Sequence, residues 1–349
     1  MKLPLKSRRT VRPFFPGCCG SVRGSRSIDD SLLAVGKLGI VIRTLNEAQH
    51  LPKLLQGIKQ QSLTPDHILV VDSGSTDATA DIARENGCTV ISLEPSKFSY
   101  GRSLNLGFSA CNTDIVVVVS AHVYPVHTDY LANLIAPFED ETVGMVYGRQ
   151  VGDKSSQYSE KMLLEGWFPG VSEAWQRHPF ANNANSAVRK DVWEQFRFSE
   201  TLPALEDIHF ANRMQEHGWF LSYQPDAEVV HVHNESWQAV KARYEREASA
   251  LRQIFPSMRL GAPKIASLMV RNIIRDVVEA KKAKELSENL WKLFLFRYWQ
   301  SVGFSSGFKK QPEQINQIML RYFYSNNGKK DVTSDDTGER VPVDYSAID

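Results

Sequence analysis

The sequence predicts an α/β protein with a doubly wound, mainly parallel sheet, helices on both faces and a C-terminal helical extension. Strand-like and helix-like patterns alternate from residue 38 to residue 119, which is typical of parallel βαβ units. The run at 115–119 is apolar without alternation, as expected for a strand that is buried on both faces. Residues 237–330 then show mostly helical patterns.

The composition is that of an ordinary globular protein. The chain has 349 residues, 42% hydrophobic and 23% charged, which suffices for one large domain and a smaller one. We expect a basic tail at 1–36, the α/β domain at 37–236, a helical region at 237–330 and an acidic tail at 331–349. The four cysteines lack metal or redox spacing, and no apolar run is as long as a membrane span. These features predict a cytoplasmic protein.

Charge is distributed unevenly along the chain. Residues 1–26 carry seven Lys/Arg and no acid, residues 257–330 carry fourteen against five acids, and residues 331–349 carry one against six. Two basic flanks indicate either contact with an anionic surface or solvated helix faces, and both interpretations stay open. The flanks lack the interleaved motifs of a nucleic-acid reader, so we expect no nucleic acid as a partner.

The elements of the α/β domain follow from periodicity and from turn signals. Strands are predicted at 38–44, 67–72, 88–93 and 115–119, and helices at 47–60, 77–86 and 102–111. Thr44 and Glu47 have capping-box spacing for the first helix, and Gly87 ends the second. Further along, we expect strands at 142–147 and 228–233, with helices near Arg189 and from Glu206. Ligands of such sheets bind at the carboxyl ends of the strands.

Polar residues follow three of the predicted strands. The first ends in Thr44-Leu45-Asn46-Glu47, the second in Asp72-Ser73-Gly74-Ser75-Thr76-Asp77, and the fourth in Ser120-Ala121-His122. The chain has neither the GxGxxG turn after the first strand nor a Walker loop, so a Rossmann dehydrogenase and a P-loop enzyme lose their main support. A tight turn with a helix cap also explains the second run, and this is compatible with ligand binding.

With these two turns, residues 37–235 resemble the GT-A fold glycosyltransferases of family 2. That family holds the nucleoside of a sugar nucleotide at the same turns. The resemblance implies that Thr44, Asn46 and Glu47 line the base and ribose. It also implies that Asp72, with Ser73 beside it, accepts a hydrogen bond from the base.

The resemblance extends to the phosphate side of the donor, with one departure. Arg102, in Gly101-Arg102-Ser103, matches a basic turn of the family and is expected to neutralise donor phosphate. The family's DxD metal motif is replaced here by Ser120-Ala121-His122. His122 would ligate a softer divalent ion or contact phosphate directly, and the family's late metal histidine corresponds to His233. Because His231 and His233 lie two apart on a strand, they face the same side. A requirement for Mn²⁺ or Mg²⁺ stays open.

The acidic pair Glu206-Asp207, with Arg213 two turns later, resembles the family's ED-x₅-R element. By this resemblance Asp207 is the general base, Glu206 orients the acceptor or the loop, and the reaction inverts the anomeric centre. Asn183 and Asn185 stand where the family contacts the acceptor and donor sugars, although capping and turn formation explain them nearly as well. Taken alone, the acidic pair would be ordinary charge at a helix N-terminus.

The C-terminal flank contains a basic stripe beside an apolar one. At 100° per residue, Lys264, Arg271, Arg275 and Lys282 share a stripe next to Ile265, Leu268, Met269, Ile273 and Val277. Such a helix either lies on an anionic membrane or packs on the catalytic domain. The run Phe296-Arg297-Tyr298-Trp299-Gln300 faintly resembles rhamnosyltransferase-like members of the family. If this helix contacts the membrane, we expect the acceptor to be linked to a lipid.

The function expected from these features is that of an inverting glycosyltransferase. It would move a sugar from a nucleotide-sugar donor to a saccharide hydroxyl in bacterial capsule, O-antigen or exopolysaccharide synthesis, at the inner face of the cell membrane. Two alternatives remain. A sugar nucleotidyltransferase would need a Gly-rich basic loop after the first strand, which Arg43-Thr44-Leu45-Asn46 is not. An inactive sugar-binding scaffold is consistent with the absence of the DxD motif, but the intact Glu206-Asp207 pair argues against it.

Overall fold

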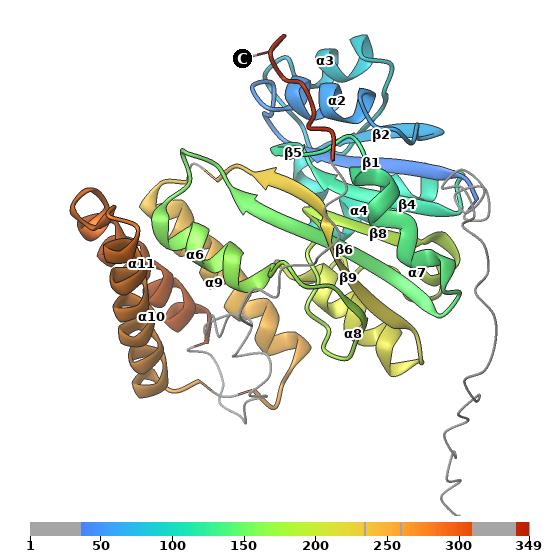
Figure 1. Ribbon diagram of the computed structural model, residues 1–349. Coiled ribbons are helices and arrows are strands. Elements are labelled where there is room, and N and C mark those ends of the chain that lie inside the picture. The colour runs from blue at the N-terminus through green and yellow to red at the C-terminus, as the bar shows by residue number, and fades with distance from the viewer. Residues whose placement is uncertain (1–35, 234, 259, 309–339, 349) are drawn as a thin grey trace, which may run out of the picture.

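Strand β1 (Leu38–Thr44) lies between β2 and β4 and runs parallel to both. The computed structural model describes residues 36–233, 235–258, 260–308 and 340–348. Within them, nine strands form one sheet in the order β3-β2-β1-β4-β8-β6-β9-β5, with β7 paired to β9 (Figure 1). The other strands are β2 (His67–Asp72), β3 (Thr89–Ser92), β4 (Ile115–Ser120), β5 (Val123–Pro125), β6 (Val143–Gly152), β7 (Glu173–Gln176), β8 (Asn185–Arg189) and β9 (Phe220–His231).

The predicted α/β class with helices on both faces is confirmed. Strands β1 to β4 are parallel, whereas β8 runs antiparallel to both β4 and β6, so the sheet is mixed in its second half. The helices are α2 (Leu51–Lys59), α3 (Thr79–Glu85), α4 (Tyr100–Ala110), α5 (Tyr130–Ile135), α6 (Tyr158–Trp167), α7 (Lys190–Phe196), α8 (Glu206–Glu216), α9 (Trp237–Ile254), α10 (Ala262–Lys282) and α11 (Leu286–Phe308), with short 3₁₀ turns at Pro95–Lys97 and Ala136–Glu139.

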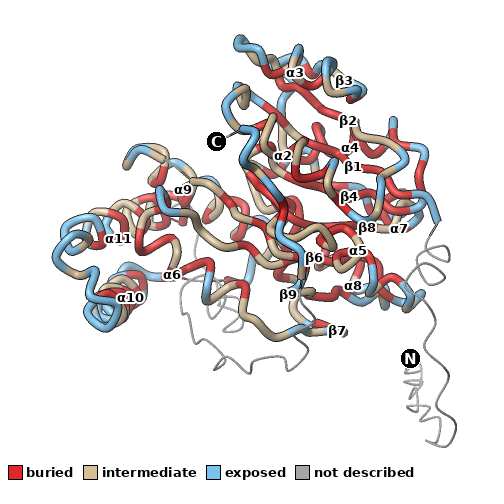
Figure 2. Tube along the Cα trace, turned by 45° about the horizontal axis from the view of Figure 1, so that its top comes forward, coloured by how far each residue is buried: buried red, intermediate tan, exposed pale blue. Residues whose placement is uncertain are grey.

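The sheet is buried on both faces because successive side chains of a strand point to opposite sides. Val41 of β1 belongs to an apolar cluster that includes α4, α7 and α8, whereas Ile40 and Ile42 belong to a second cluster that includes α2 and α5. All five residues of the predicted 115–119 strand are buried. Figure 2 shows the strands as a buried layer between half-exposed helices.

The predicted capping box at the first helix is wrong. Helix α2 begins at Leu51 instead of residue 47, and Pro52, which lacks an N–H donor, lies in its first turn. The Thr44 hydroxyl bonds the Asp72 carboxylate, and the Glu47 carboxylate bonds His122, so neither caps the helix. Both side chains bind residues that are distant in the sequence, so the local capping motif does not form.

The C-terminal helices pack onto the α/β domain. Arg297 of α11 makes a buried salt bridge to Asp276 of α10 at 2.7 Å, and Ser159 of α6 donates a hydrogen bond of 2.6 Å to the same carboxylate. Ile265 and Leu268 of the predicted apolar stripe are buried in the main core. Residues 309–330 of the predicted helical region lie outside the described residues.

The chain returns to the α/β domain at its C-terminal end, where residues 340–348 lie beside α2 and β5 (Figure 1). Arg340 pairs with Asp129 at 2.7 Å, Val343 is 9% exposed, and the Tyr345 hydroxyl donates to the Pro125 carbonyl at 2.7 Å. This part of the expected acidic tail is therefore packed structure. The rest of it, at 331–339, and residues 1–35 of the basic tail lie outside the described residues. No helix in the described part of the chain is long and apolar enough to cross a membrane.

Candidate active site

The turn after β2 is organised by Asp72. This residue pairs with Thr44 across β1 and β2, and the Thr44 hydroxyl donates to Asp72 Oδ1 at 3.2 Å. The other carboxylate oxygen accepts from the backbone N–H groups of Gly74, at 3.3 Å, and Ser75, at 3.1 Å. Ser73, also buried, donates its N–H to the Thr44 carbonyl at 3.0 Å. Asp72 thus holds its own turn, as the turn interpretation of this run expects.

The turn after β1 is tied to the turn after β2. Asn46 has a left-handed backbone (φ 56°), and its side-chain oxygen accepts from the Thr76 N–H at 2.8 Å. The Asn46 N–H donates to Ser75 Oγ at 2.8 Å, and the Glu47 N–H donates to Thr79 Oγ1 at 2.7 Å. The two turns form one hydrogen-bonded rim along the carboxyl ends of the parallel strands.

The predicted acidic pair opens α8, as expected from the sequence. Leu205 precedes the helix with a left-handed backbone (φ 57°), and both Glu206 and Asp207 are buried. Asp207 Oδ2 accepts the backbone N–H of Asn183 at 3.0 Å, and the Asn183 side chain donates to Glu206 at 3.3 Å. Asn183 therefore positions both carboxylates.

Burial and the neighbouring charge of Glu206 raise the pKa of Asp207 to about 7, against the hydrogen bonds from Asn183 and Ile208 and the charge of Arg43. Arg43 Nη1 lies 3.4 Å from Glu206 Oε1, and the guanidinium also stacks over the Tyr100 ring. A carboxylate with a raised pKa is a stronger proton acceptor than an ordinary aspartate. Asp207 is therefore suited to general-base chemistry near neutral pH.

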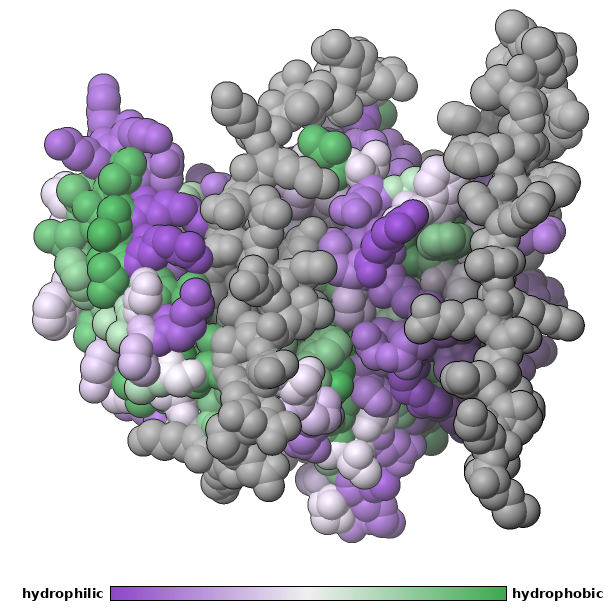
Figure 3. Space-filling model, turned by 90° about the horizontal axis from the view of Figure 1, so that it is seen from below, coloured by the Kyte–Doolittle hydropathy of each residue, from purple (hydrophilic) through white to green (hydrophobic). Residues whose placement is uncertain are grey.

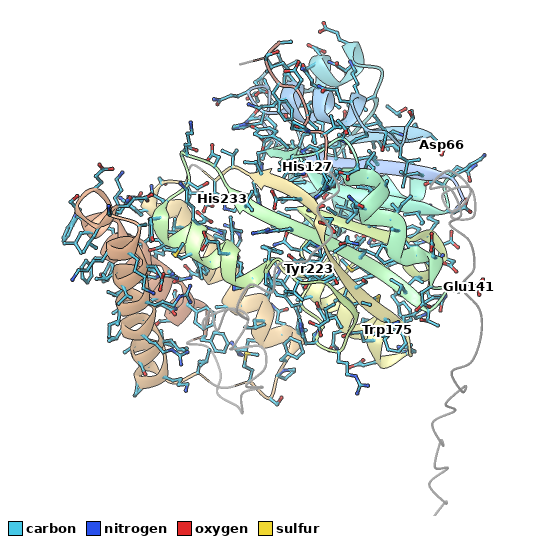
Figure 4. All side chains as sticks on the ribbon, in the orientation of Figure 1. Asp66, His127, Glu141, Trp175, Tyr223 and His233 are labelled. Carbon is cyan, nitrogen blue, oxygen red and sulfur yellow. The ribbon has the colours of Figure 1, made fainter. Side chains whose placement is uncertain are left out.

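Three histidines gather beside this pair. His122 follows β4, and His231 ends β9. His233, labelled in Figure 4, lies just beyond β9. A ring nitrogen of each lies within 4.8 Å of ring nitrogens of the other two, and the Nε2 atoms of His231 and His233 are 2.8 Å apart. Burial lowers the pKa of His231 well below 6.5, which favours its neutral imidazole.

The carboxylate pair and the histidines open into one cavity of about 280 Å³. The predicted site residues that line it are Asn183, Glu206, Asp207, His122 and His233. Its remaining lining residues are Arg43, Tyr100, Ser120, Asn182, Ala184, Ala204, Leu205, His231, Glu235, Arg243, Arg246 and Glu247. Acids, imidazoles and guanidiniums thus face a space large enough for a small polar ligand.

Other predicted site residues lie away from this cavity. Arg102 pairs with Glu200 at 2.8 Å on the surface of α4, and Ala121 is buried beside His122. The Asn185 side-chain amide donates to the carbonyls of Arg149 and Ala227 and accepts from the Tyr130 hydroxyl. All of its hydrogen bonds in the described structure are thus made within the protein. Arg213 donates to the Phe196 carbonyl at 2.7 Å. In the described structure, the contacts of Asn185 and Arg213 serve the scaffold.

Several lining residues carried no signal in the sequence. Arg43 is the last residue but one of β1 and stands directly before the Thr44-Leu45-Asn46-Glu47 turn, a position that could have marked it as a candidate. Arg243, Arg246 and Glu247 come from α9, more than thirty residues beyond the acidic pair, with no recognisable motif. Within the described residues, Arg43 Nε and Arg243 Nε are buried without a hydrogen-bond partner, so donors to an anionic ligand are available.

A comparison with known families matches this architecture. Residues 39–196 match the model described as glycosyl transferase family 2. This match and the relatives described next support a glycosyltransferase.

Two of the relatives are rhamnosyltransferases of O-antigen chains. The chain is 27% identical over 211 residues to O-antigen chain rhamnosyltransferase RfbN of Salmonella typhimurium, covering 57% of this chain and 67% of that protein. It is also 27% identical over 188 residues to O-antigen chain rhamnosyltransferase WbaN of Salmonella anatum, covering 50% of this chain and 59% of that protein. Both alignments thus leave at least a third of the chain without a counterpart.

A solved structure confirms the GT-A fold. The mannosyltransferase PcManGT from Pyrobaculum calidifontis, in complex with GDP-Man and Mn²⁺, matches with a TM-score of 0.54 at 20% identity. The match covers 79% of this chain and 88% of that one. At this level of identity the likeness concerns the fold alone.

Proposed function

We propose that this protein transfers a sugar from a nucleotide-sugar donor to a hydroxyl of a saccharide acceptor, with inversion at the anomeric carbon. The observation that carries the proposal is Asp207: a buried carboxylate with a pKa of about 7, fixed by the Asn183 N–H and facing the cavity. A base held at contact distance with a matched pKa is what proton removal from an alcohol requires.

The proposed step balances as a single displacement. The acceptor oxygen forms a bond to the anomeric carbon while the bond from that carbon to the diphosphate oxygen breaks. Asp207 takes the acceptor proton, and the nucleoside diphosphate leaves with the bonding electron pair. Glu206, which touches both Asn183 and Arg43, acts as a positioning residue for this base.

The donor nucleoside is proposed to lie along the rim formed by the turns after β1 and β2. This proposal assigns base and ribose contacts to Thr44, Asn46, Glu47, Asp72 and Ser73. Its support is positional, since ligands of parallel sheets bind at the carboxyl ends of the strands. The described contacts of Asp72 serve its turn, so base binding would use that carboxylate alongside its turn contacts or exchange some of them.

The diphosphate is proposed to lie in the cavity, which three arginines line beside the acidic residues. Arg43, Arg243 and Arg246 supply guanidinium groups that suit phosphate oxygens. Arg102 would act only after leaving Glu200. A divalent cation at His122 and His233 would supply further neutralisation of the leaving group when bound.

The acceptor is proposed to be a growing bacterial surface polysaccharide, carried on a lipid at the cytoplasmic face of the membrane. The two rhamnosyltransferases of O-antigen chains support the polysaccharide. The exposed apolar side chains of α10 and α11 support the membrane, since Ile274 is 59% and Trp291 72% exposed. Figure 3 shows apolar surface next to hydrophilic surface on one side of the molecule. Exposed lysines flank this face, among them Lys281, Lys282 and Lys292, which suits anionic lipid headgroups.

The first experiment is thermal unfolding of the full chain against a panel of nucleoside diphosphates, followed by donor consumption with the matching sugar nucleotides. One diphosphate at a hundred times its dissociation constant should stabilise the protein by about 2.7 kcal/mol. The corresponding sugar nucleotide should then be consumed by the native protein and not by Asp207→Asn. Stabilisation without consumption of any sugar nucleotide, in the presence of oligosaccharide and lipid-linked acceptors, would favour the inactive scaffold instead.

A further inference from the structure

The three cavity histidines share a hydrogen-bonding pattern that goes beyond their proximity. His122 Nδ1 lies 2.8 Å from Glu47 Oε1, His231 Nδ1 lies 2.7 Å from Gln150 Oε1, and His233 Nδ1 lies 2.6 Å from Glu160 Oε1. Each partner atom is an oxygen acceptor, so each Nδ1 carries the hydrogen. In a neutral imidazole the remaining lone pair is then on Nε2.

One ligand nitrogen of each histidine lies within 4.8 Å of those of the other two. The Nε2 atoms of His231 and His233 are 2.8 Å apart, and the His122 and His231 rings stack with centroids at 5.2 Å. Two Nε2 lone pairs at this distance repel each other unless a cation or a proton lies between them. An oxygen acceptor behind Nδ1 is also the arrangement that orients histidine ligands of metal ions in proteins.

We propose that His122, His231 and His233 form a three-imidazole site that binds a borderline transition-metal dication, with Zn²⁺ as the representative ion, in preference to Mg²⁺. Three protein ligands leave the fourth tetrahedral position open, as in catalytic zinc sites. Imidazole nitrogen suits Zn²⁺ and its neighbours, whereas Mg²⁺ prefers carboxylate, carbonyl and water oxygens. The preference for Zn²⁺ over Mg²⁺ follows from the ligands alone. Only the role of the bound ion, which is to face the donor diphosphate, rests on the proposed function.

A second group near the cavity, formed by Glu160, His233 and Glu235, fits a cation less well. Arg243 Nη2 already lies 2.7 Å from Glu160 Oε1 and 2.7 Å from Glu235 Oε2, so the guanidinium supplies the positive charge there. Glu160 is 3% exposed, and Arg243 holds it as the anion that orients His233. Glu160 and Glu235 therefore pair with Arg243, and Glu160 also orients His233. The imidazoles remain as the groups that would ligate the ion.

The test measures metal binding to the full chain after chelator treatment and dialysis, by calorimetry with ZnCl₂ and with MgCl₂. We expect one Zn²⁺ per chain, a Zn²⁺-dependent rise in Tm, and at least a 100-fold weaker response to Mg²⁺. Co²⁺ in place of Zn²⁺ should give the strong visible absorption of a four-coordinate, nitrogen-ligated ion. Equal affinity for Mg²⁺, or no binding of either ion, would overturn the proposal.

The variants are His122→Gln, which removes a half-exposed ligand, and His231→Gln, which removes a buried one. Each should weaken Zn²⁺ binding by more than the roughly 10- to 100-fold that loss of an orienting partner causes. His67→Gln, at the start of β2, is the matched control, since His67 bonds Thr89 far from the cavity. Unchanged Zn²⁺ affinity in both cooperatively folded ligand variants would refute the site.

The same measurements separate this inference from the proposed function. Zn²⁺ binding that depends on the three histidines, in a protein that consumes no sugar nucleotide, would uphold the metal site and refute the transferase proposal. Sugar transfer by a protein that binds no Zn²⁺ would do the reverse.

Discussion

The backbone N–H of Asn183 donates a 3.0 Å hydrogen bond to Oδ2 of Asp207. It joins the segment before β8 to the first turn of α8, twenty-four residues later. The side chain of Asn183 also holds Glu206, at 3.3 Å. One residue thus fixes the geometry of both acids.

Replacing this base tests its role directly. Asp207→Asn keeps an oxygen for the Asn183 N–H but cannot accept the acceptor proton. We expect kcat to fall by about 10²- to 10⁴-fold, the usual contribution of a general base, with the dissociation constant of the nucleoside diphosphate nearly unchanged. Glu216→Gln, at the exposed end of the same helix, is the control and should retain full turnover. Loss of diphosphate binding in Asp207→Asn would point to a donor-binding role instead.

The pH dependence follows from the raised pKa of Asp207. Only the ionised carboxylate accepts a proton, so kcat/KM should fall as the pH drops through about 7. Because the charge of Glu206 raises this pKa, Glu206→Gln should move the acid limb to lower pH. The measurement is a pH–rate profile of both proteins at saturating metal. An acid limb that stays in place in the variant would contradict the coupling between the two acids.

The buried pair Arg297–Asp276 controls the stability of the C-terminal helices. The two side chains are 1% and 0% exposed, so Arg297→Met leaves an uncompensated buried carboxylate. We expect a loss of about 3–5 kcal/mol in the free energy of unfolding, with most of it recovered in Arg297→Met/Asp276→Leu. Denaturant unfolding measures both changes, and Lys282→Met, which breaks an exposed pair with Glu279, is the control. Equal stability of the single variant and the native chain would show that water reaches the site.

The exposed face of α10 and α11 should bind anionic lipid. The double substitution Ile274→Gln/Trp291→Gln removes its two most exposed apolar side chains and should reduce co-sedimentation with phosphatidylserine vesicles severalfold. Binding of the native chain should weaken as salt is raised, because the flanking lysines are screened. Trp175→Gln, which removes a tryptophan 60% exposed on β7, is the control. Equal binding by the control and the double variant would argue against this face.

Residues 340–348 should contribute to the stability of the α/β domain. Val343 is 9% exposed and Ile348 is 39% exposed in the same segment. Val343→Ala should therefore lower the free energy of unfolding by about 1–2 kcal/mol, while Ile348→Ala should change it much less. Thermal unfolding of the two variants gives the comparison. A similar effect of both would show that the segment dissociates before the domain unfolds.

The sequence by itself determined the local elements and much of the acid site. The alternation of patterns up to residue 119 predicted β1 to β4 and their parallel order, because period and connection length decide these features locally. It also placed Glu206 and Asp207 at the start of a helix, whereas the strand predicted to run through His233 ends at His231. Where local motifs competed with distant partners, as at Thr44 and Glu47, the prediction was wrong.

Only the tertiary structure decided which of these residues meet. Strand β8 lies antiparallel between β4 and β6, and the His122 ring stacks on that of His231. Arg243, from a helix without a recognisable motif, lines the cavity as well. The tertiary structure also chose which side of α10 is buried, leaving Ile274 exposed. Such choices depend on the packing of elements far apart in the chain, and the period of a single segment carries no information about its partner.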